Sequence, residues 1–421
     1  MSPRRVRIVG GGLTGVLAAL QAHRLGCREI DLHERFDDLG GVARSRQAHG
    51  LELREGCLYF GPRGDPMRGL LESHGVVFED FENRFGSVSP APGGELAITH
   101  DFGGPALATR DLTLSPMAGD TLTDRLRAYP AEIGQALTRY CQWHLGTWLD
   151  EVHESAAIPL AINRVFPVGP DIAQIATRKR ADRLHDELYA IPRQLWGRLD
   201  NLTAALPRGG FGAFFTQCRR ELERLGVRIH DTSLVSPRQA LAERQPGEAL
   251  VWAANPMPLF KTLDMEAPKL IKKSFATYAF KVRYGGPLPF YVQNFTAQGA
   301  VFRIYLYESR GQAVLLAECV REASDADLRR ELHRLMSGFG GASLSIGEQV
   351  AANVGPRWIY QSTDAMKKLV ALRADFARTL GDAFVPGAWE PYSKAEKFAQ
   401  VNVGLAAAFD AADAPAAVSA A

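Results

Sequence analysis

Hydrophobic and polar positions near the start of the chain alternate in an order that predicts a strand, a helix and a second strand. Residues 5–9 form a short run whose apolar members and flanks indicate a buried strand. Hydrophobic residues then recur at helical spacing, at Val16, Leu17, Leu20 and Leu25. Gly26 is the expected end of that helix, and residues 29–33 predict the second strand, which leads directly into Glu34.

Later segments of the chain show the same helical and strand periodicities. Helical spacing predicts helices over residues 65–74, 121–153, 206–225, 323–336 and 364–380. Short apolar runs predict two strands within residues 227–235 and one strand at residues 249–254. Residues 274–319 are rich in Phe, Tyr and Val with period-two alternation, so we expect an antiparallel sheet there.

A glycine-rich turn joins the first strand to the first helix. Gly10-Gly11-Gly12-Leu13-Thr14-Gly15 has the spacing G-x-G-x-x-G. Gly10 allows a tight turn, Gly12 leaves room for a pyrophosphate at the helix N-terminus, and Gly15 allows the helix to pack closely on the strand. Glu34 stands where a carboxylate can accept hydrogen bonds from an adenosine ribose. The pattern predicts dinucleotide binding; the alternative is a purely structural βαβ turn.

Composition limits the remaining possibilities. The chain has 421 residues, which is enough for two lobes, and its net charge of +2 implies no polyanion partner such as nucleic acid. No apolar run approaches the about 18 residues needed to cross a bilayer. The first strand begins almost at once, so we expect no cleaved signal peptide. The five cysteines are scattered without C-x-x-C spacing, which favours a reducing cytoplasm and argues against a metal site.

A second glycine pair distinguishes the candidate dinucleotides. Residues 38–45, Asp-Leu-Gly-Gly-Val-Ala-Arg-Ser, place Gly40, Gly41 and Arg44 shortly after Glu34. An NAD-binding domain does not need this loop, whereas a cofactor that lies extended across the domain does. The segment resembles the opening of the FAD-dependent amine oxidase, protoporphyrinogen oxidase and UDP-galactopyranose mutase group. That resemblance implies FAD, with Arg44 touching its phosphates.

The resemblance extends to several other segments. Residues 51–62 are similar to the family's segment that leads to the isoalloxazine ring, although the family often has a histidine where this chain has Leu58. Val235 stands where the family places a valine over the adenine. Residues 384–408 are similar to its closing strand, turn and final helix, but Ala388 replaces the expected acid. The final helix N-terminus would face the flavin and stabilise its anionic reduced form.

These patterns give an expected set of FAD-binding residues: Gly10, Gly12, Leu13, Thr14, Gly15, Glu34, Arg35, Gly41, Val42, Ala43, Arg44, Leu58, Tyr59, Val235, Gly387, Lys397 and Phe398. Some family members attach FAD through a cysteine in the C-terminal region. No cysteine lies beyond Cys319, so we expect FAD to be bound non-covalently.

The expected fold class is α/β, with a discontinuous Rossmann-type FAD-binding lobe and an α+β substrate lobe that contains an antiparallel sheet and helices. We assign residues 1–95, 200–262 and 352–421 to the FAD-binding domain. Residues 96–199 and 263–351 then form the substrate-binding domain.

Two residues of the second lobe are the candidate catalytic groups. Lys281 resembles the amine oxidases' lysine that holds a water near flavin N5, and Arg303 resembles an arginine that mutase-like members point at an anionic substrate. For each, the alternative is a solvent-facing charge on a strand. His144 is read as structural or solvent-facing, and the basic cluster at residues 178–183 as a solvated helix face, with an anionic-substrate site as the alternative.

Two functions follow from the resemblance, and a third option is a flavin-binding protein that has lost catalysis. One is an oxidoreductase that passes a hydride from a small-molecule substrate to flavin N5. The other is a UDP-galactopyranose mutase-like isomerase that acts on a nucleotide sugar with no net redox change. Lys281 and the missing histidine at Leu58 favour the oxidase, whereas Arg303 and Gly387-Ala388-Trp389 favour the mutase.

Overall fold

A parallel sheet with helices on both faces carries the first and last strands that the structure describes. The computed structural model describes residues 5–54, 59–90, 96–100, 108–109, 114–162, 166–167, 172–189, 203–339, 343–387, 389–390 and 392–413. The sheet has the order β11-β2-β1-β12-β18, and its paired strands are all parallel. Its members are β1 (Arg5–Val9), β2 (Glu29–His33), β11 (Arg228–His230), β12 (Glu248–Trp252) and β18 (Phe384–Pro386).

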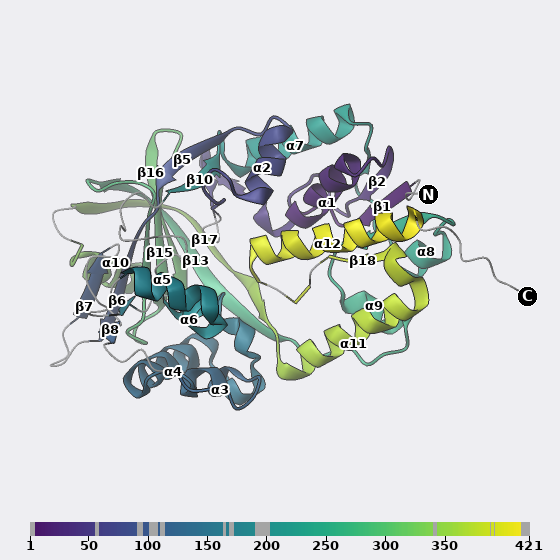
Figure 1. Cartoon of the computed structure of the whole chain (residues 1–421). Helices are drawn as coiled ribbons and strands as arrows, with labels where there is room; N and C mark the ends of the chain where they lie inside the picture. Colours follow the sequence, from purple (N-terminus) through teal and green to yellow (C-terminus); the bar gives the residue numbers. More distant parts are fainter. Residues whose placement is uncertain are drawn as a thin grey trace, which may run out of the picture.

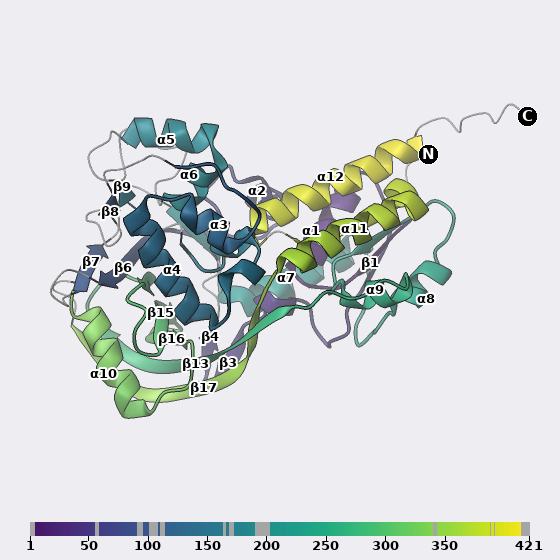
Figure 2. The same ribbon diagram turned by 90° about the horizontal axis from the view of Figure 1, so that it is seen from below.

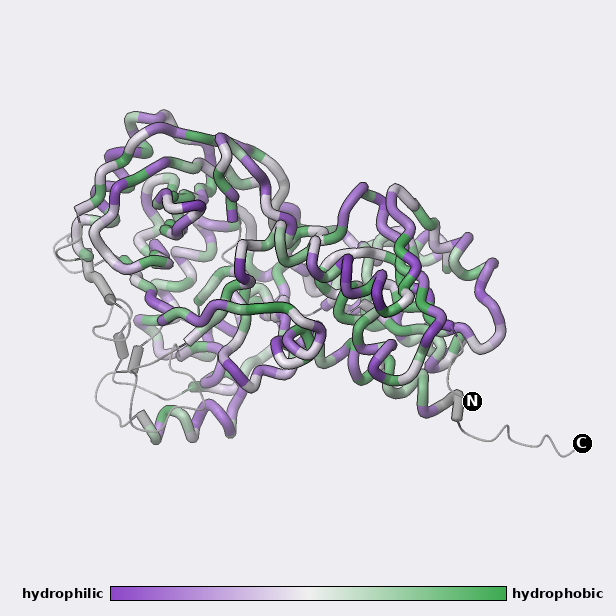
Figure 3. The backbone as a smooth tube through the Cα atoms, turned by 90° about the horizontal axis from the view of Figure 1, so that it is seen from above, coloured by the Kyte–Doolittle hydropathy of each residue, from purple (hydrophilic) through white to green (hydrophobic). Residues whose placement is uncertain are grey.

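Alternate side chains of these strands pack into two separate hydrophobic cores. Val6 and Ile8 point to one face, which is covered by α1 (Leu13–Arg24), α2 (Pro66–Ser73), α7 (Gly210–Arg224) and α12 (Lys394–Asp413). Val9 and Leu250 point to the other, which is covered by α8 (Pro237–Ala242), α9 (Met257–Thr262) and α11 (Thr363–Leu380). Figure 3 shows hydrophobic stretches inside this lobe and hydrophilic ones on its outer turns.

A second, larger sheet forms the other lobe (Figure 1). Its order is β17-β13-β16-β15-β14-β6-β7, and its paired strands are antiparallel except for β14 and β6. The strands are β17 (Leu344–Tyr360), β13 (Ile271–Tyr284), β16 (Gln312–Cys319), β15 (Val301–Ser309), β14 (Phe290–Asn294), β6 (Arg84–Pro90) and β7 (Leu96–His100). The mixed α/β fold class predicted from the sequence is therefore confirmed.

Helices lie on both faces of the second sheet (Figure 2). One face packs on α10 (Asp325–Met336), and the other faces α3 (Leu122–Arg127) and α4 (Ala131–Leu145). The same lobe contains α5 (Ile172–Ala181) and α6 (Arg183–Leu188). Three strand pairs stand outside the two large sheets: β3 (Arg46–Ala48) with β4 (Leu51–Leu53), β5 (Phe78–Glu82) with β10 (Thr203–Pro207), and β8 (Ala108–Thr109) with β9 (Phe166–Pro167).

Several sequence-based element assignments need correction. Residues 121–153 do not form one helix, because Pro130 begins a second helix and Gly146, in the left-handed region at φ 63°, ends it. Residues 227–235 contain one strand rather than two, and the helix predicted from residue 206 begins at Gly210, after β10. The long strand β17 was not predicted at all. Among the described residues, no helix combines the length and apolar character needed to cross a membrane.

The predicted domain boundaries stay predictions. β6 lies within residues 1–95, which we assigned to the FAD-binding domain, yet it is a strand of the second sheet. β17 likewise continues past residue 351 while paired with β13. Both pairings argue for moving these boundaries.

Candidate functional site

The first glycine turn lies at the carboxyl edge of the parallel sheet, between β1 and β12. Gly10 adopts φ +106°, and a Cβ there would lie 2.8 Å from the amide nitrogen of Ala254. A Cβ on Gly15 would lie 1.9 Å from the carbonyl oxygen of Gly10, so α1 packs directly on the turn. Gly12 differs, because its Cβ would meet nothing nearer than Gly41 Cα at 3.8 Å. Gly12 therefore could hold a Cβ in ordinary contact with the second glycine pair, unlike Gly10 and Gly15.

The order of the strands reverses at the same point. β2 and β11 lie on one side of β1, whereas β12 and β18 lie on the other. In open parallel sheets, ligands bind outside the carboxyl ends of the strands at such a switch point. The sheet topology and the glycine turn therefore indicate the same location.

Glu34 is buried at this edge, where its carboxylate already accepts two backbone hydrogen bonds. The amides of Gly11 and Phe36 donate to it at 2.7 and 3.0 Å. A carboxylate has about four acceptor positions, so two remain for ligand hydroxyls. Glu34 thus holds the glycine turn and can also serve the predicted ribose contact.

The second glycine pair packs against the first turn. The amide of Gly40 donates to the carbonyl of Gly11 at 2.9 Å, and a Cβ on Gly41 would lie 3.1 Å from Gly12 Cα. Residues 41–43 form a short 3-10 helix in which Val42 is fully exposed and Ala43 is buried. Arg44, predicted to touch phosphates, is exposed and pairs with Asp37 at 3.3 Å. Arg35 is also exposed and lies over the ring of Phe36.

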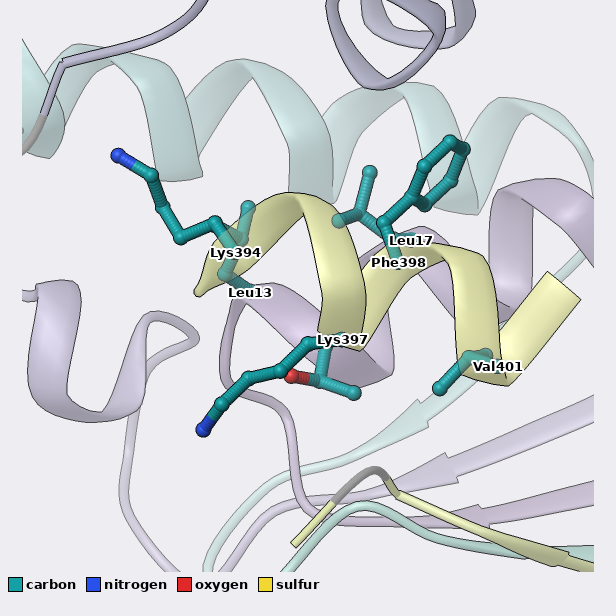
Figure 4. A pocket seen from close by; sticks show the side chains of 7 residues that line it. Leu13, Leu17, Lys394, Lys397, Phe398 and Val401 are labelled. Atoms are coloured by element: carbon teal, nitrogen blue, oxygen red, sulfur yellow. The ribbon is translucent and has the colours of Figure 1, made fainter. Parts of the chain in front are cut away.

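A small cleft of about 270 Å³ opens where the first turns of α1 and α12 meet. Figure 4 shows this cleft and the side chains around it. The lining comprises Leu13, Thr14, Leu17, Lys394, Lys397, Phe398 and Val401. Four of these, namely Leu13, Thr14, Lys397 and Phe398, belong to the FAD-binding set predicted from the sequence. The structure thus brings together residues from the two ends of the chain.

The lining of the cleft is positively charged. Both of its charged side chains are lysines, and no described carboxylate lines it. The Lys394 ammonium donates to the carbonyl of Tyr59 and lies 5.4 Å from the ring centroid of Phe60. The half-buried Lys397 ammonium has no hydrogen-bond or ion-pair partner among the described residues, and burial lowers the pKa of Lys397 from its ordinary value.

The N-terminus of α1 adds to this positive potential, whereas the first turn of α12 contains Glu396 between its two lysines. No side chain caps α1, and its first turn contains no acidic residue. Its first amides therefore have no intrahelical acceptors and point out of the helix at the beginning of the cleft. The arrangement is suited to binding an anion.

Tyr59 connects the cleft to the second lobe. Its ring packs edge-on against that of Tyr305, with 5.8 Å between centroids, and Tyr305 stacks on Tyr307 at 4.8 Å. The hydroxyl of Tyr307 accepts from the amide of Arg54 at 3.0 Å and donates to the carbonyl of Glu52 at 2.9 Å. An aromatic row thus leads from the cleft to the inner face of the antiparallel sheet.

The other predicted FAD contacts lie outside the cleft. Gly387 follows β18, where a Cβ would lie 2.3 Å from the carbonyl oxygen of Trp252, so it permits the closing strand to approach β12. Val235 lines a separate polar groove of about 620 Å³ together with Arg5, His33 and His230. Leu58 lies outside the described residues. These contacts stay predictions.

The two candidate catalytic residues are not at the cleft. Lys281 is one-third exposed and its ammonium pairs with Glu348 at 2.8 Å. Arg303 is buried and forms an ion pair with Glu318, which lies directly opposite it on β16. Both assignments stay predictions: Lys281 is a partly exposed charge on a strand, as in its structural alternative, whereas Arg303 is buried rather than solvent-facing.

His144 and the basic cluster have structural contacts. His144 is buried, its Nε2 lies 3.0 Å from the Tyr360 hydroxyl, and burial holds its pKa well below the ordinary value. The buried ammonium of Lys179 donates to the carbonyls of Asp186 and Tyr189 at 2.5 Å each. Lys179 thus ties α5 to α6, which argues against the anionic-substrate reading of this cluster.

Sequence reasoning missed Lys394, although a signal for it was present. Lys394 and Lys397 lie on either side of Glu396 in the first turn of α12, where the helix dipole favours an acid and disfavours cations. Two lysines at a helix start are a signal for a nearby anion once that start is known, although Glu396 offsets part of their charge.

Comparisons with known proteins agree with this geometry. Residues 8–73 match the family model described as an NAD(P)-binding Rossmann-like domain. No curated protein matches the chain in sequence. The chain does share its fold with solved structures of low sequence identity, which are similar over nearly its whole length.

Three of those structures illustrate the range of activities among proteins with this fold. A reduced UDP-galactopyranose mutase has 12% identity and a TM-score of 0.61, covering 96% of this chain and 94% of its own. A putrescine oxidase triple mutant has 14% identity and a TM-score of 0.56, covering 97% and 98%. A fatty acid isomerase from P. acnes that produces CLA has 14% identity and a TM-score of 0.53, covering 96% and 97%. The fold is therefore that of two-lobe proteins with different activities.

Proposed function

We propose that this protein is an FAD-dependent oxidoreductase of the amine oxidase type, which takes a hydride from a small-molecule substrate. The observation that supports this most is the cationic cleft formed by α1 and α12 at the switch point of the parallel sheet. The resemblance of residues 38–45 to the FAD-binding family favours FAD over NAD, although the matching family model carries the NAD(P) description.

The residues at the site fit such a cofactor. Gly12 leaves room for a pyrophosphate at the helix N-terminus, the free acceptor positions of Glu34 suit ribose hydroxyls, and Lys397 offers an uncompensated positive charge. None of the four described cysteines lines the cleft, and all four are buried, which supports non-covalent binding. Bound FAD would supply the acceptor for a hydride.

The chain itself would orient the cofactor and exclude water. α12 runs from the region between the lobes along the parallel-sheet lobe, and its N-terminus points toward the second lobe (Figure 1). The first turn of α12 would therefore place positive potential beside the cofactor. Tyr59 and Tyr305 would present aromatic surface to a substrate bound between this point and the antiparallel sheet.

The cofactor assignment is tested on the purified protein. We expect a yellow protein that releases FAD on denaturation, measured by absorbance and by chromatography of the supernatant. A colourless protein that binds NAD instead would contradict the assignment.

The reaction type is tested anaerobically. Amines, amino acids and UDP-sugars are added in turn to the oxidised protein, and an oxidoreductase substrate should bleach the flavin absorbance. Turnover of a nucleotide sugar that requires prior reduction by dithionite, without bleaching, would show the UDP-galactopyranose mutase-like alternative instead. We favour the oxidoreductase because Arg303, the residue that favoured the mutase, is held in an ion pair by Glu318.

A further inference from the structure

Two cations of the expected FAD-binding set, Arg44 and Lys397, are candidates to meet the cofactor's phosphates. Arg44, implied by the resemblance, is 45% exposed and pairs with Asp37 on the surface. Lys397 comes from the opposite end of the chain and lines the cleft together with Leu13 and Thr14, which open α1. Arg44 and Lys397 are therefore alternative candidates for the contact with the cofactor's phosphates.

We propose that Lys397 is the cation that binds the pyrophosphate of the dinucleotide, in place of Arg44. The inference rests on the proposed function for the presence of a dinucleotide, and it assigns a role that neither the resemblance nor the comparisons give to this residue.

The surroundings of the ammonium support the assignment. Among the described residues that line the cleft, Lys394 is the one other charged side chain, and it too is a cation. The Lys394 ammonium already donates to the carbonyl of Tyr59. The first turns of α1 and α12 present their positive ends to the same space. Burial lowers the pKa of Lys397, which is the direction expected of an ammonium without a counter-ion.

The cleft lies at the first turn of α1, where Leu13 and Thr14 line it directly after Gly12 in the sequence. A pyrophosphate there would accept hydrogen bonds from the α1 amides on one side and from Lys397 on the other. The anion would bridge two segments from opposite ends of the chain.

The test compares Lys397→Met with Arg44→Met in the full-length protein. The dissociation constant for FAD is measured by the change in flavin fluorescence after removal of bound cofactor, and the rate of FAD release is measured from the loaded protein. We expect Lys397→Met to weaken binding roughly 10- to 100-fold, the effect of one hydrogen bond to a charged group, and Arg44→Met to change it less than about twofold. Lys397→Arg, which keeps the charge, should restore most of the affinity.

Two further readouts separate a phosphate contact from other roles. The affinity of Lys397→Met should fall less steeply with added salt than that of the unaltered protein, because one ion pair has been removed. The midpoint potential of the bound flavin should be the same in both proteins. A changed potential would place Lys397 at the isoalloxazine ring and overturn the proposal, and so would a Lys397→Met protein with unaltered FAD affinity. Thermal unfolding of each apoprotein shows whether any loss comes from misfolding.

Failure of the proposed function is distinguishable from failure of this inference. If the unaltered protein binds NAD rather than FAD, the FAD assignment is wrong, and the same variants are compared with NAD, which also carries a pyrophosphate. If the unaltered protein binds neither, both proposals are overturned. If Arg44→Met loses affinity and Lys397→Met does not, only the inference fails.

Discussion

The cleft of the parallel-sheet lobe and the inner face of the antiparallel sheet each contain a cation withdrawn from solvent, in opposite electrostatic surroundings. Lys397 lines the cleft beside a second lysine and two helix N-termini, and no described carboxylate lines it. Arg303 lies opposite Glu318 across two strands and forms an ion pair with it. A buried charge without a counter-ion is costly, so it is retained where a ligand supplies the opposite charge. The compensated charge serves the fold, and the uncompensated one indicates a binding site.

Gly12→Val should have the largest effect on cofactor binding at the cleft. The structure has room for a Cβ at this position, so the protein should fold, whereas the branched side chain would fill the space that a pyrophosphate needs. We expect complete loss of bound flavin with little change in thermal unfolding, measured by absorbance and calorimetry. Gly15→Val is the matched control for folding, because its Cβ would lie 1.9 Å from the carbonyl oxygen of Gly10 and should prevent α1 from packing. A Gly12→Val protein with stoichiometric FAD would move the cofactor elsewhere.

Removal of Arg303 should affect stability rather than cofactor binding. Arg303→Met leaves Glu318 buried without its ion-pair partner, which should cost roughly 3–5 kcal/mol of unfolding free energy. Flavin content per folded molecule should not change. Urea titration measures the first quantity and absorbance the second.

A double variant, Arg303→Met with Glu318→Met, provides the control for that prediction. Replacing both charges with apolar groups should recover much of the lost stability. If Arg303→Met instead keeps full stability and raises only the KM for an anionic substrate, Arg303 is a substrate contact, as the mutase hypothesis requires.

Glu34→Ala should have an intermediate effect on both FAD affinity and folding stability. Loss of the ribose contacts should weaken FAD binding by roughly 1.5–3 kcal/mol for each hydrogen bond to the carboxylate. The amides of Gly11 and Phe36 would also lose their acceptor, so the unfolding temperature should fall as well. Fluorescence titration and a thermal scan measure the two effects. Unchanged FAD affinity with a lowered unfolding temperature would reduce Glu34 to a structural role.

The smallest effect is expected for Lys281→Met. The pair with Glu348 is largely exposed, so its loss should change the unfolding free energy by less than about 1 kcal/mol. Stopped-flow measurement of flavin reduction and reoxidation tests the catalytic prediction in the same variant. Slower reoxidation with unaltered reduction would show that Lys281 acts near the flavin, despite its position on the surface.

The local elements and the antiparallel sheet of residues 274–319 were accessible from the sequence, whereas the long edge strand of that sheet was not. β1, β2 and the glycine turn follow from contacts within about 30 residues, and their predicted bounds agree with the structure. β17 was missed because it contains Gly347, Gly355 and Pro356, which a sheet tolerates on an edge strand. Its identity as a strand comes from pairing with β13 alone.

The residues of the candidate site also differ in whether the sequence could reveal their contacts. The glycine motif led to Leu13 and Thr14, whereas the role of Lys394 depends on the carbonyl of Tyr59, which no spacing rule connects to it. Arg303 shows the opposite case, because a resemblance suggested a ligand contact and the register of two strands supplied Glu318 instead. Motifs therefore predicted the glycine turn and several residues of the cleft, and the fold added the contacts of Lys394 and Arg303.

The division of the cleft between α1 and α12 also affects how the protein is made. The glycine turn is synthesised well before β18 and Lys397, which follow hundreds of residues later in the sequence. At typical elongation rates of roughly 5–20 residues per second, the two halves of the cleft are separated by tens of seconds. We therefore expect stable cofactor capture to follow synthesis of β18 and α12, so that nascent chains stalled before β18 would carry no tightly bound cofactor.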